Sequence, residues 1–313
     1  MYDLIIIGGG PAGLTAAIYA IRKRLNVILV SSDLGGKTNY HMVVPWVETQ
    51  PIIRGTDLVD KFRRELEYLD FVNRIEAVNT VTRDDDIFVV KMAGGDELRT
   101  QSLILATGSN VIHLDVPGEQ KYIGRGVSYS AVSYAPMFIG KHTTVIGDGM
   151  LALRAVAELA QVAETVHLVA PKRDILDQPV TQSLMIDSSK VVVLAGYKVK
   201  AIEGNGFVER VILESPDGEV TELGTDGVFV ELGLVPNTDL VKGLVDLDSK
   251  GRVIIDNANR TSCPGLFAAG DVTNAYAEQV LIASGEGAKA ALSAYEYLSF
   301  LSVPEADRQP LPV

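Results

Sequence analysis

The sequence is poor in cysteine and histidine, and this scarcity excludes several kinds of site. Its 313 residues include one cysteine, Cys263, and four histidines. A single cysteine cannot form an intrachain disulfide or supply a cluster of thiolate ligands. No two histidines have the spacing of metal ligands on one helix or strand. We therefore expect no metal site in this protein.

Basic residues and long apolar runs are also scarce. The chain has 28 Lys and Arg against 40 Asp and Glu, a formal net charge of −12. This excess of acid argues against nucleic acid and against an anionic membrane surface as partners. No apolar run approaches the roughly 18 residues that a transmembrane helix needs, and MYDLIIIGGG is typical of a buried strand rather than a signal peptide. We expect a globular, cytoplasmic protein with no transmembrane segment.

Glycine, by contrast, is plentiful, and six residues near the N-terminus carry the first informative motif. Gly8-x-Gly10-x-x-Gly13 follows the apolar run 2–8 and precedes LTAAIYAIRKR, which is typical of a helix; a second strand is expected at 26–30. In such a strand–helix–strand unit the glycines allow a tight turn, close approach of a pyrophosphate and close helix packing. The helix N-terminus favours the negative phosphates. The motif predicts a dinucleotide site.

A second copy of the motif occurs in the middle of the chain. Gly147-x-Gly149-x-x-Ala152 lies between the expected strands 141–146 and 165–169 and opens the helical stretch ALRAVAELAQVA. Two such units predict an α/β fold with two Rossmann-like (three-layer ββα) nucleotide-binding domains. Further strands are expected at FVVKM and ELRTQ, which lead into SLILATGSN, and a long helix is expected at 279–299.

The order of these segments resembles the low-molecular-weight thioredoxin-reductase-like flavoproteins. The resemblance rests on GGGPAGLTAAIYA (8–20), LGGKT (34–38), LILATGS (103–109), GRGVSY (124–129), VIGDGMLA (145–152), GVFVELGLVPNT (227–238) and CPGLFAAGDV (263–272). It implies a discontinuous FAD-binding domain, 1–114 with 243–313, an inserted NADPH-like nucleotide-binding domain, 115–242, and a homodimer. It also implies a structural role for Cys263, and residues 303–313 are expected to form a loose tail.

The resemblance also implies which residues contact FAD. The first motif holds the pyrophosphate, Thr107 and Gly108 form a turn against the cofactor, and Asp271 contacts the ribityl chain or, alternatively, caps a turn or helix. A helix starting at Gln279 and Val280 suits the negative charge of a reduced flavin. The full predicted set is Gly8, Gly10, Pro11, Ala12, Gly13, Ser31, Gly36, Lys37, Thr38, Trp46, Thr107, Gly108, Gly270, Asp271, Gln279 and Val280.

Several positions depart from the pattern of these flavoproteins. Ser31, with Asp33 two residues on, stands where an acid holds the adenosine ribose, so ribose binding is expected to be altered. Trp46 stands near the place of a flavin-loop asparagine, and is either a core residue or a ring beside the flavin. In the stretch APKR (170–173) a proline occupies the place of an arginine that binds the 2′-phosphate. Lys172 and Arg173 either meet a phosphate or form a solvated charge pair, so NADPH use is doubtful.

Two serines occupy the positions of the redox cysteines. The run SYSAVSYAP places Ser130 and Ser133 at the two thiols of the C-x-x-C motif, and Tyr134 at the acid that follows. A hydroxyl cannot cycle between dithiol and disulfide. Three explanations stay open: natural loss of the thiols, deliberate replacement by the closest isostere, and ordinary polar residues that cap a turn before Pro136.

Taken together, the departures are similar to those of the diflavin-linked disulfide oxidoreductases of cyanobacteria. In those enzymes a second FAD takes the place of NADPH, which implies that Gly147, Asp148, Gly149, Met150 and Leu151 bind a second pyrophosphate and that Tyr134 or Trp46 flanks the flavins. Two other functions stay open, a cysteine-independent NAD(P)H reductase of ferredoxin or quinone and a flavin redox sensor. The electron partner, a thiol or disulfide protein or a small molecule, is not identified by the sequence.

Overall fold

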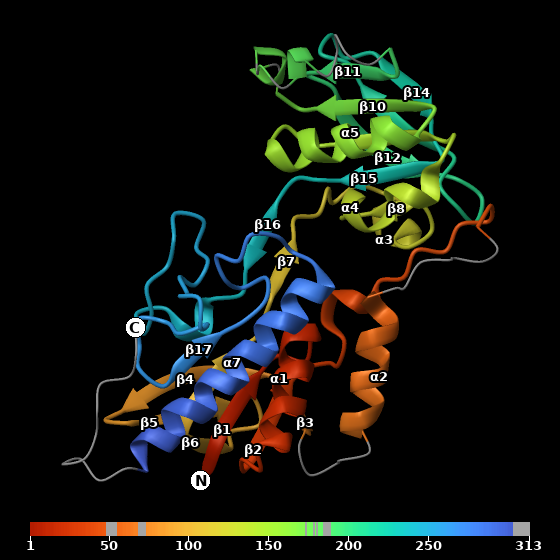
Figure 1. Cartoon of the computed structure of the whole chain (residues 1–313). Helices are drawn as coiled ribbons and strands as arrows, with labels where there is room; N and C mark the ends of the chain where they lie inside the picture. The colour runs from red at the N-terminus through yellow and green to blue at the C-terminus, as the bar shows by residue number, and fades with distance from the viewer. Residues whose placement is uncertain are drawn as a thin grey trace. The chain divides into compact units, whose positions relative to one another are not determined.

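A computed structural model describes residues 1–47, 55–67, 73–172, 174–177, 179, 181–183 and 189–302. Its contacts divide the chain into two compact units, labelled by element in Figure 1. Unit 1 comprises Met1–Asn39, Ile52–Asn110 and Val235–Val313, and unit 2 comprises Tyr40–Pro51 and Val111–Leu234. The predicted tail, 303–313, lies outside the described residues.

The boundaries of the two units differ from the predicted domain boundaries. The chain passes between them after Asn110 and after Leu234, where β7 (Ser109–Val111) and β16 (Leu234–Pro236) pair with each other. A larger difference concerns Tyr40–Pro51, which the sequence assigned to the FAD-binding domain but which groups with unit 2. Its Val43 amide donates to the carbonyl of Gly124 at 2.7 Å, and Met42 is buried in the core of unit 2. Contacts with residues distant in the sequence therefore assign this segment to unit 2.

Unit 1 is built on one seven-stranded sheet of order β3-β2-β1-β6-β5-β4, with β17 paired to β6. Its strands are β1 (Tyr2–Ile7), β2 (Val27–Ser31), β3 (Asn73–Ile75), β4 (Val78–Asp84), β5 (Ile87–Met92), β6 (Glu97–Leu105) and β17 (Leu266–Ala268). The first three, β6 and β17 pair in parallel, whereas β4–β5 and β5–β6 are antiparallel. The predicted strand ELRTQ and the following SLIL are one continuous strand, β6, since its first half pairs with β5 and its second half continues beside β1.

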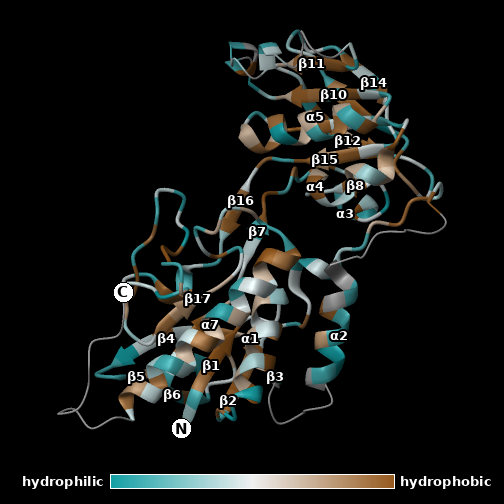
Figure 2. Cartoon of the chain, in the orientation of Figure 1, coloured by the Kyte–Doolittle hydropathy of each residue, from teal (hydrophilic) through white to brown (hydrophobic). Residues whose placement is uncertain are grey.

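Both faces of this sheet are buried, which explains the unbroken apolar run of β1. Leu4 and Ile6 pack with helices α1 (Pro11–Arg22), α2 (Gly55–Glu67) and α7 (Val280–Leu301). Their neighbours Ile5 and Ile7 belong to a separate cluster on the opposite face. Figure 2 shows the hydrophobic colouring of β1. A strand covered on both sides needs apolar residues at every position rather than at every second one.

Unit 2 has a five-stranded parallel sheet of order β11-β10-β9-β15-β8 and a three-stranded antiparallel sheet of order β12-β13-β14. The parallel strands are β8 (Val127–Ser128), β9 (His142–Ile146), β10 (Thr165–Ala170), β11 (Val191–Ala195) and β15 (Gly227–Val230). The antiparallel strands are β12 (Lys198–Glu203), β13 (Arg210–Glu214) and β14 (Val220–Gly224). The order of a parallel sheet, helices and a glycine-rich first turn in each unit is that of two Rossmann-like domains, as predicted.

The remaining helices are short except for α5 (Met150–Val162), which follows the second glycine motif. They are α3 (Glu119–Tyr122), α4 (Ala131–Tyr134) and the 3-10 helices η1 (Gly36–Asn39), η3 (Ala135–Phe138), η4 (Asp174–Asp177) and η5 (Asp239–Val241). In the part of the chain that the structure describes, no helix combines the length and apolar character needed to cross a membrane.

Close packing of α1 on α7 leads to a stability prediction. A Cβ added at the buried Gly287 of α7 would lie 2.0 Å from the carbonyl oxygen of Ala12, an overlap with backbone. We expect Gly287→Ala to lower the free energy of unfolding by about 3 kcal/mol, because the two helices must separate.

The exposed Gly285 on the same helix is the control, since it has open space around its Cβ position. Gly285→Ala is therefore expected to stabilise by about 1 kcal/mol. Urea unfolding of both variants measures the contrast; equal effects would show that α1 and α7 are not in close contact.

Candidate functional site

The first glycine motif joins the end of β1 to the start of α1 by backbone-to-backbone packing. Gly8 has a φ of +115°, and a Cβ there would lie 2.2 Å from the carbonyl oxygen of Ala106, directly after β6. A Cβ at Gly13 would lie 1.8 Å from the carbonyl oxygen of Gly8. Only glycine fits at these two positions, as the motif predicts for the tight turn and the close helix.

Gly10 differs from its neighbours because nothing of the described protein occupies the space beside it. It is the N-cap of α1, followed by Pro11, and an added Cβ would meet no described atom within 4 Å. The first amides of a helix have no partners within the helix, and they attract negative charge. The space in front of Gly10 thus has the form and the charge preference of a pyrophosphate site.

The loop after β2 is tied to this motif by side chains. Ser31 Oγ accepts a hydrogen bond of 2.8 Å from the amide of Gly9, and Asp33 Oδ1 accepts one of 2.9 Å from the amide of Gly36. A Cβ at Gly36 would lie 3.3 Å from the Cα of Gly10, so the two loops touch. Ser31, the expected ribose position, therefore supports the glycine loop within the protein.

Three further predicted segments meet at this edge of unit 1. Lys37 Nζ lies 2.6 Å from Asp271 Oδ2 and donates to Ser109 Oγ at 2.9 Å. Gly270 lies against the motif, since its Cβ would be 3.1 Å from the Cβ of Ala12. The structure thus brings together residues of 8–13, 36–38, 107–109 and 270–271. Asp271 is an ion-pair partner of Lys37 here, and its contact with the ribityl chain stays a prediction.

Two predicted FAD-binding segments of unit 1 remain, the turn at Thr107 and Gly108 and the start of α7. Thr107 Oγ1 donates to the carbonyl of Asn237 at 2.7 Å, and Asn237 Nδ2 donates back to the carbonyl of Thr107 at 2.9 Å. Helix α7 begins at Val280 with Gln279 as its N-cap. Asn237 was not singled out in the sequence, although it lies in the quoted run GVFVELGLVPNT.

The second motif repeats this local geometry in unit 2. A Cβ at Gly147 would lie 2.5 Å from the carbonyl oxygen of Glu231, whereas one at Gly149, the N-cap of α5, would meet no described atom within 4 Å. Asp148 forms an ion pair of 3.0 Å with Lys172, and this hydrogen bond raises the pKa of Lys172. The contact of Lys172 with a phosphate stays a prediction, because the ion pair with Asp148 is neither of the two predicted alternatives. Met150 is exposed, and Arg173 lies outside the described residues.

Trp46 and Tyr134 both lie in unit 2 and both have protein partners. Trp46 Nε1 donates to the carbonyl of Met137 at 2.7 Å, and its ring meets Phe138 edge-on at 5.7 Å between centroids. Lys141 Nζ lies 4.3 Å from the centre of the tryptophan ring. Tyr134 donates its hydroxyl to the carbonyl of Tyr40 at 2.9 Å. For Trp46 the structure therefore shows the packing role, and a ring contact with flavin stays a prediction.

The serine pair forms the start of α4. Ser130 is its N-cap and accepts a hydrogen bond of 3.4 Å from the amide of Ser133, while its hydroxyl donates to the hydroxyl of Ser133 at 2.9 Å. The amide of Ala131 donates to Glu231 Oε1 at 3.0 Å. The hydroxyl of Ser130 thus caps this turn and bonds to the hydroxyl of Ser133, an arrangement that all three explanations of the serine pair allow. Glu231 was missed by sequence reasoning, since only the fold brings the end of β15 to residue 131.

A buried carboxylate beside this turn was also missed. Glu119 is 1% exposed and accepts hydrogen bonds from the amides of Leu114 and Asp115 and from the hydroxyl of Tyr129 at 2.9 Å. Tyr129 donates its hydroxyl to Glu119, and the same hydroxyl lies 2.8 Å from His113 Nδ1. Burial, and then the hydrogen bond to Glu119, raise the pKa of Tyr129.

Removing the Tyr129 hydroxyl is expected to cost stability. Tyr129→Phe leaves the buried carboxylate of Glu119 with one donor fewer, which we expect to lower the free energy of unfolding by about 2 kcal/mol. Tyr122 is the matched control, because its hydroxyl donates to a neutral carbonyl, that of Gly204. Tyr122→Phe should cost about 1 kcal/mol. Denaturant unfolding compares the two variants, and a larger loss for Tyr122→Phe would contradict the stabilising role of the hydrogen bond from Tyr129 to the buried Glu119.

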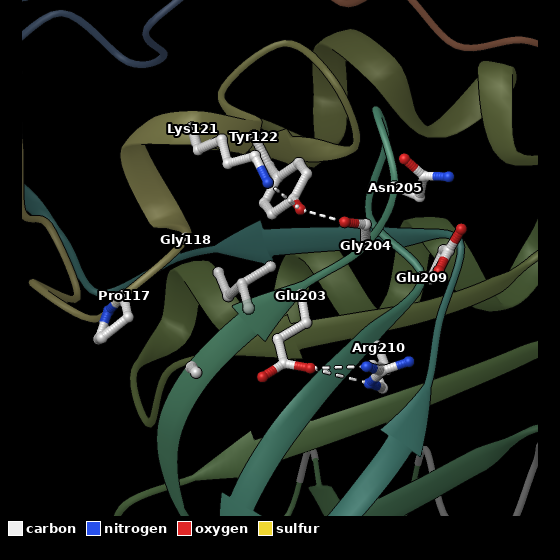
Figure 3. Close-up of a pocket in the computed structure, with 11 residues that line it drawn as sticks. Pro117, Gly118, Lys121, Tyr122, Glu203, Gly204, Asn205, Glu209 and Arg210 are labelled. Carbon is white, nitrogen blue, oxygen red and sulfur yellow. Dashed lines mark hydrogen bonds and ion pairs between the residues drawn. The ribbon is translucent and has the colours of Figure 1, made fainter.

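Two further features lie apart from the predicted site residues. Cys263 is buried in unit 1, and its Sγ accepts a hydrogen bond of 3.1 Å from Arg83 Nη1. A cavity of about 480 Å³ in unit 2 is lined by residues that include Lys121, Tyr122, Glu203 and Arg210 (Figure 3). In it Arg210 pairs with Glu203 at 2.8 Å. No predicted site residue lines this cavity, so the cavity does not mark either nucleotide position.

Comparison with known proteins agrees with this geometry. The family model described as "Pyridine nucleotide-disulphide oxidoreductase" matches residues 2–287. The chain belongs to this family. The description of the family names its members as oxidoreductases. The match spans both glycine motifs, the serine turn and the start of α7, so the residues described above lie within the region that defines the family.

Three relatives with different names are similar to the chain. A subunit of the alkyl hydroperoxide reductase of Pseudomonas putida is 35% identical over 311 residues, which are 97% of this chain and 59% of that protein. A protein named NADH dehydrogenase from Bacillus subtilis (strain 168) is 32% identical over 95% of this chain and 58% of its own length. The chain thus spans about three fifths of these curated relatives. The crystal structure of thioredoxin reductase from Streptococcus pyogenes MGAS5005 is 34% identical, with a TM-score of 0.86 over 96% of this chain and 98% of that one.

Proposed function

We propose that this oxidoreductase binds FAD in unit 1 and is a thioredoxin-reductase-like flavoprotein whose thiol and disulfide chemistry is absent because Ser130 and Ser133 replace the redox cysteines. The observation that carries the proposal is the open space beside Gly10, in front of the first amides of α1. Around it lie the glycine loop, Lys37 and Asp271, which supply backbone donors, a cation and an acceptor. These are the groups that a pyrophosphate and a polyhydroxylated chain require.

Different groups of unit 1 suit different parts of the cofactor. The amides at the start of α1 hold negative charge, and the fixed turn of Thr107 and Gly108 limits where a ring system can lie. The first amides of α7, from Val280 on, have no acceptor within the helix, and such amides favour an electron-rich ring. FAD, when bound, supplies two-electron transfer. The protein itself carries no internal dithiol, because a hydroxyl at 130 and 133 cannot accept or release electrons.

For unit 2 we propose a second FAD in place of NADPH, as in the diflavin-linked enzymes of cyanobacteria. Gly149 leaves open space before α5, which suits a pyrophosphate. Pro171 occupies the place of a phosphate-binding arginine, and Lys172 is held by Asp148. Because a 2′-phosphate needs free cationic donors, this arrangement favours a nucleotide without one. The homodimer, the cytoplasmic location and the electron partner stay predictions.

The flavin content of the purified chain tests both proposals. Flavin released by denaturation and quantified by absorbance is expected at about two per chain, one for each open glycine motif. A value near one would confine FAD to unit 1 and overturn the second site, and a value near zero would overturn the proposed function. NADPH added without oxygen is expected to leave the flavin oxidised for minutes. Rapid bleaching would instead favour the cysteine-independent NAD(P)H reductase of ferredoxin or quinone.

A further inference from the structure

We propose that Lys37 and Asp271 form a charge-balancing pair that sets the reduction potential of the flavin in unit 1, in addition to any contact they make with the cofactor. The inference rests on the proposed FAD site. It starts from a placement that the sequence does not reveal, since the pair joins two segments at opposite ends of the chain.

The pair spans the first glycine motif. Lys37 follows Gly36, whose Cβ position lies 3.3 Å from the Cα of Gly10, and Asp271 follows Gly270, whose Cβ position lies 3.1 Å from the Cβ of Ala12. The two side chains meet at 2.6 Å between Nζ and Oδ2. Their charges therefore lie at the same edge of unit 1 as the space in front of α1.

Both side chains of the pair are partly buried, so water screens their charges less than it screens charges on the open surface. The side chain of Asp271 is 15% exposed and that of Lys37 is 35% exposed. Lys37 also donates to Ser109 Oγ at 2.9 Å, which fixes the ammonium between two segments. Charges that are partly removed from water and held in place interact over several ångströms more strongly than free surface charges do.

Removing either charge is expected to shift the reduction potential of the flavin in a direction that can be predicted. Reduction by two electrons with uptake of one proton leaves the flavin with one more negative charge. With the pair intact, the local charge is balanced. Without Lys37 the carboxylate of Asp271 opposes this added charge, and without Asp271 the ammonium of Lys37 favours it. The signs of the two effects do not depend on which atom of the ring lies closest to the pair.

The experiment is a double-mutant cycle on the FAD-loaded full chain. The variants are Lys37→Met, Asp271→Asn and the two together, and the midpoint potential is measured by reduction with dithionite against a reference dye. At a fixed potential, we expect the ratio of reduced to oxidised flavin to fall roughly tenfold for Lys37→Met and to rise roughly tenfold for Asp271→Asn. The double variant should return close to the unmodified protein.

A matched control and the flavin content separate this inference from the proposed function. Lys289 and Glu286 form an ion pair of 2.9 Å on α7, so Lys289→Met removes a paired lysine elsewhere in unit 1 and should leave the potential unchanged. Absence of FAD from the unmodified chain would refute the proposed function. Bound FAD with potentials that shift in the same direction in both single variants, or do not shift, would refute the charge-balancing role alone.

Discussion

Replacing Gly10 by alanine is expected to remove most of the FAD from the purified protein while leaving the free energy of unfolding of the apoprotein unchanged. Gly10 has a φ of −75°, which alanine adopts without strain, and an added Cβ meets no described atom within 4 Å. The methyl group therefore costs the protein nothing. It occupies the space that a pyrophosphate needs in order to approach the amides of α1, and we expect FAD affinity to fall by about a hundredfold.

Gly13 is the matched control for Gly10, because the same methyl group has the opposite effect there. A Cβ at Gly13 would lie 1.8 Å from the carbonyl oxygen of Gly8, so Gly13→Ala must displace α1 from β1. We expect a loss of about 3 kcal/mol in the free energy of unfolding. Thermal unfolding of the apoproteins and titration with FAD measure the two quantities separately. If Gly10→Ala binds FAD as tightly as the unmodified chain, the open space in front of α1 is not the pyrophosphate site.

Placing cysteine at both serine positions is expected to create a disulfide that takes electrons from the flavin. The hydroxyls of Ser130 and Ser133 lie 2.9 Å apart, so two sulfur atoms at these positions need only a small movement to bond. In the double variant Ser130→Cys with Ser133→Cys, a disulfide accepts two electrons. An anaerobic titration should therefore require about one further two-electron equivalent per chain for full reduction.

The single variant Ser133→Cys is the control for this experiment. It has the same added sulfur at one position but no partner thiol, because Cys263 is buried in unit 1 and already accepts a hydrogen bond from Arg83. Its titration should equal that of the unmodified chain. If the oxidised double variant takes up no additional electrons, a disulfide between residues 130 and 133 does not exchange electrons with the flavin.

The sequence by itself determined those features that depend on residues close together in the chain. Both glycine motifs, their flanking strands and helices, the Rossmann-like class and the start of the last helix near Val280 follow from local spacing and from apolar runs. A tight turn and a close helix approach need glycine within a few residues of each other, so Gly8 and Gly13 reveal the geometry directly. The serine spacing, by contrast, left three explanations open.

Only the tertiary structure decided which distant residues meet. The placement of Tyr40–Pro51 in unit 2, the packing of Trp46 on Phe138 and the contact between Glu231 and Ala131 depend on contacts that no local pattern encodes. The pairing of Lys37 with Asp271 is of the same kind, since the sequence singled out each residue separately but did not show that the two side chains meet. Parallel strands bring their carboxyl ends to one edge of a sheet whatever their order in the chain, and it is this edge that assembles the site.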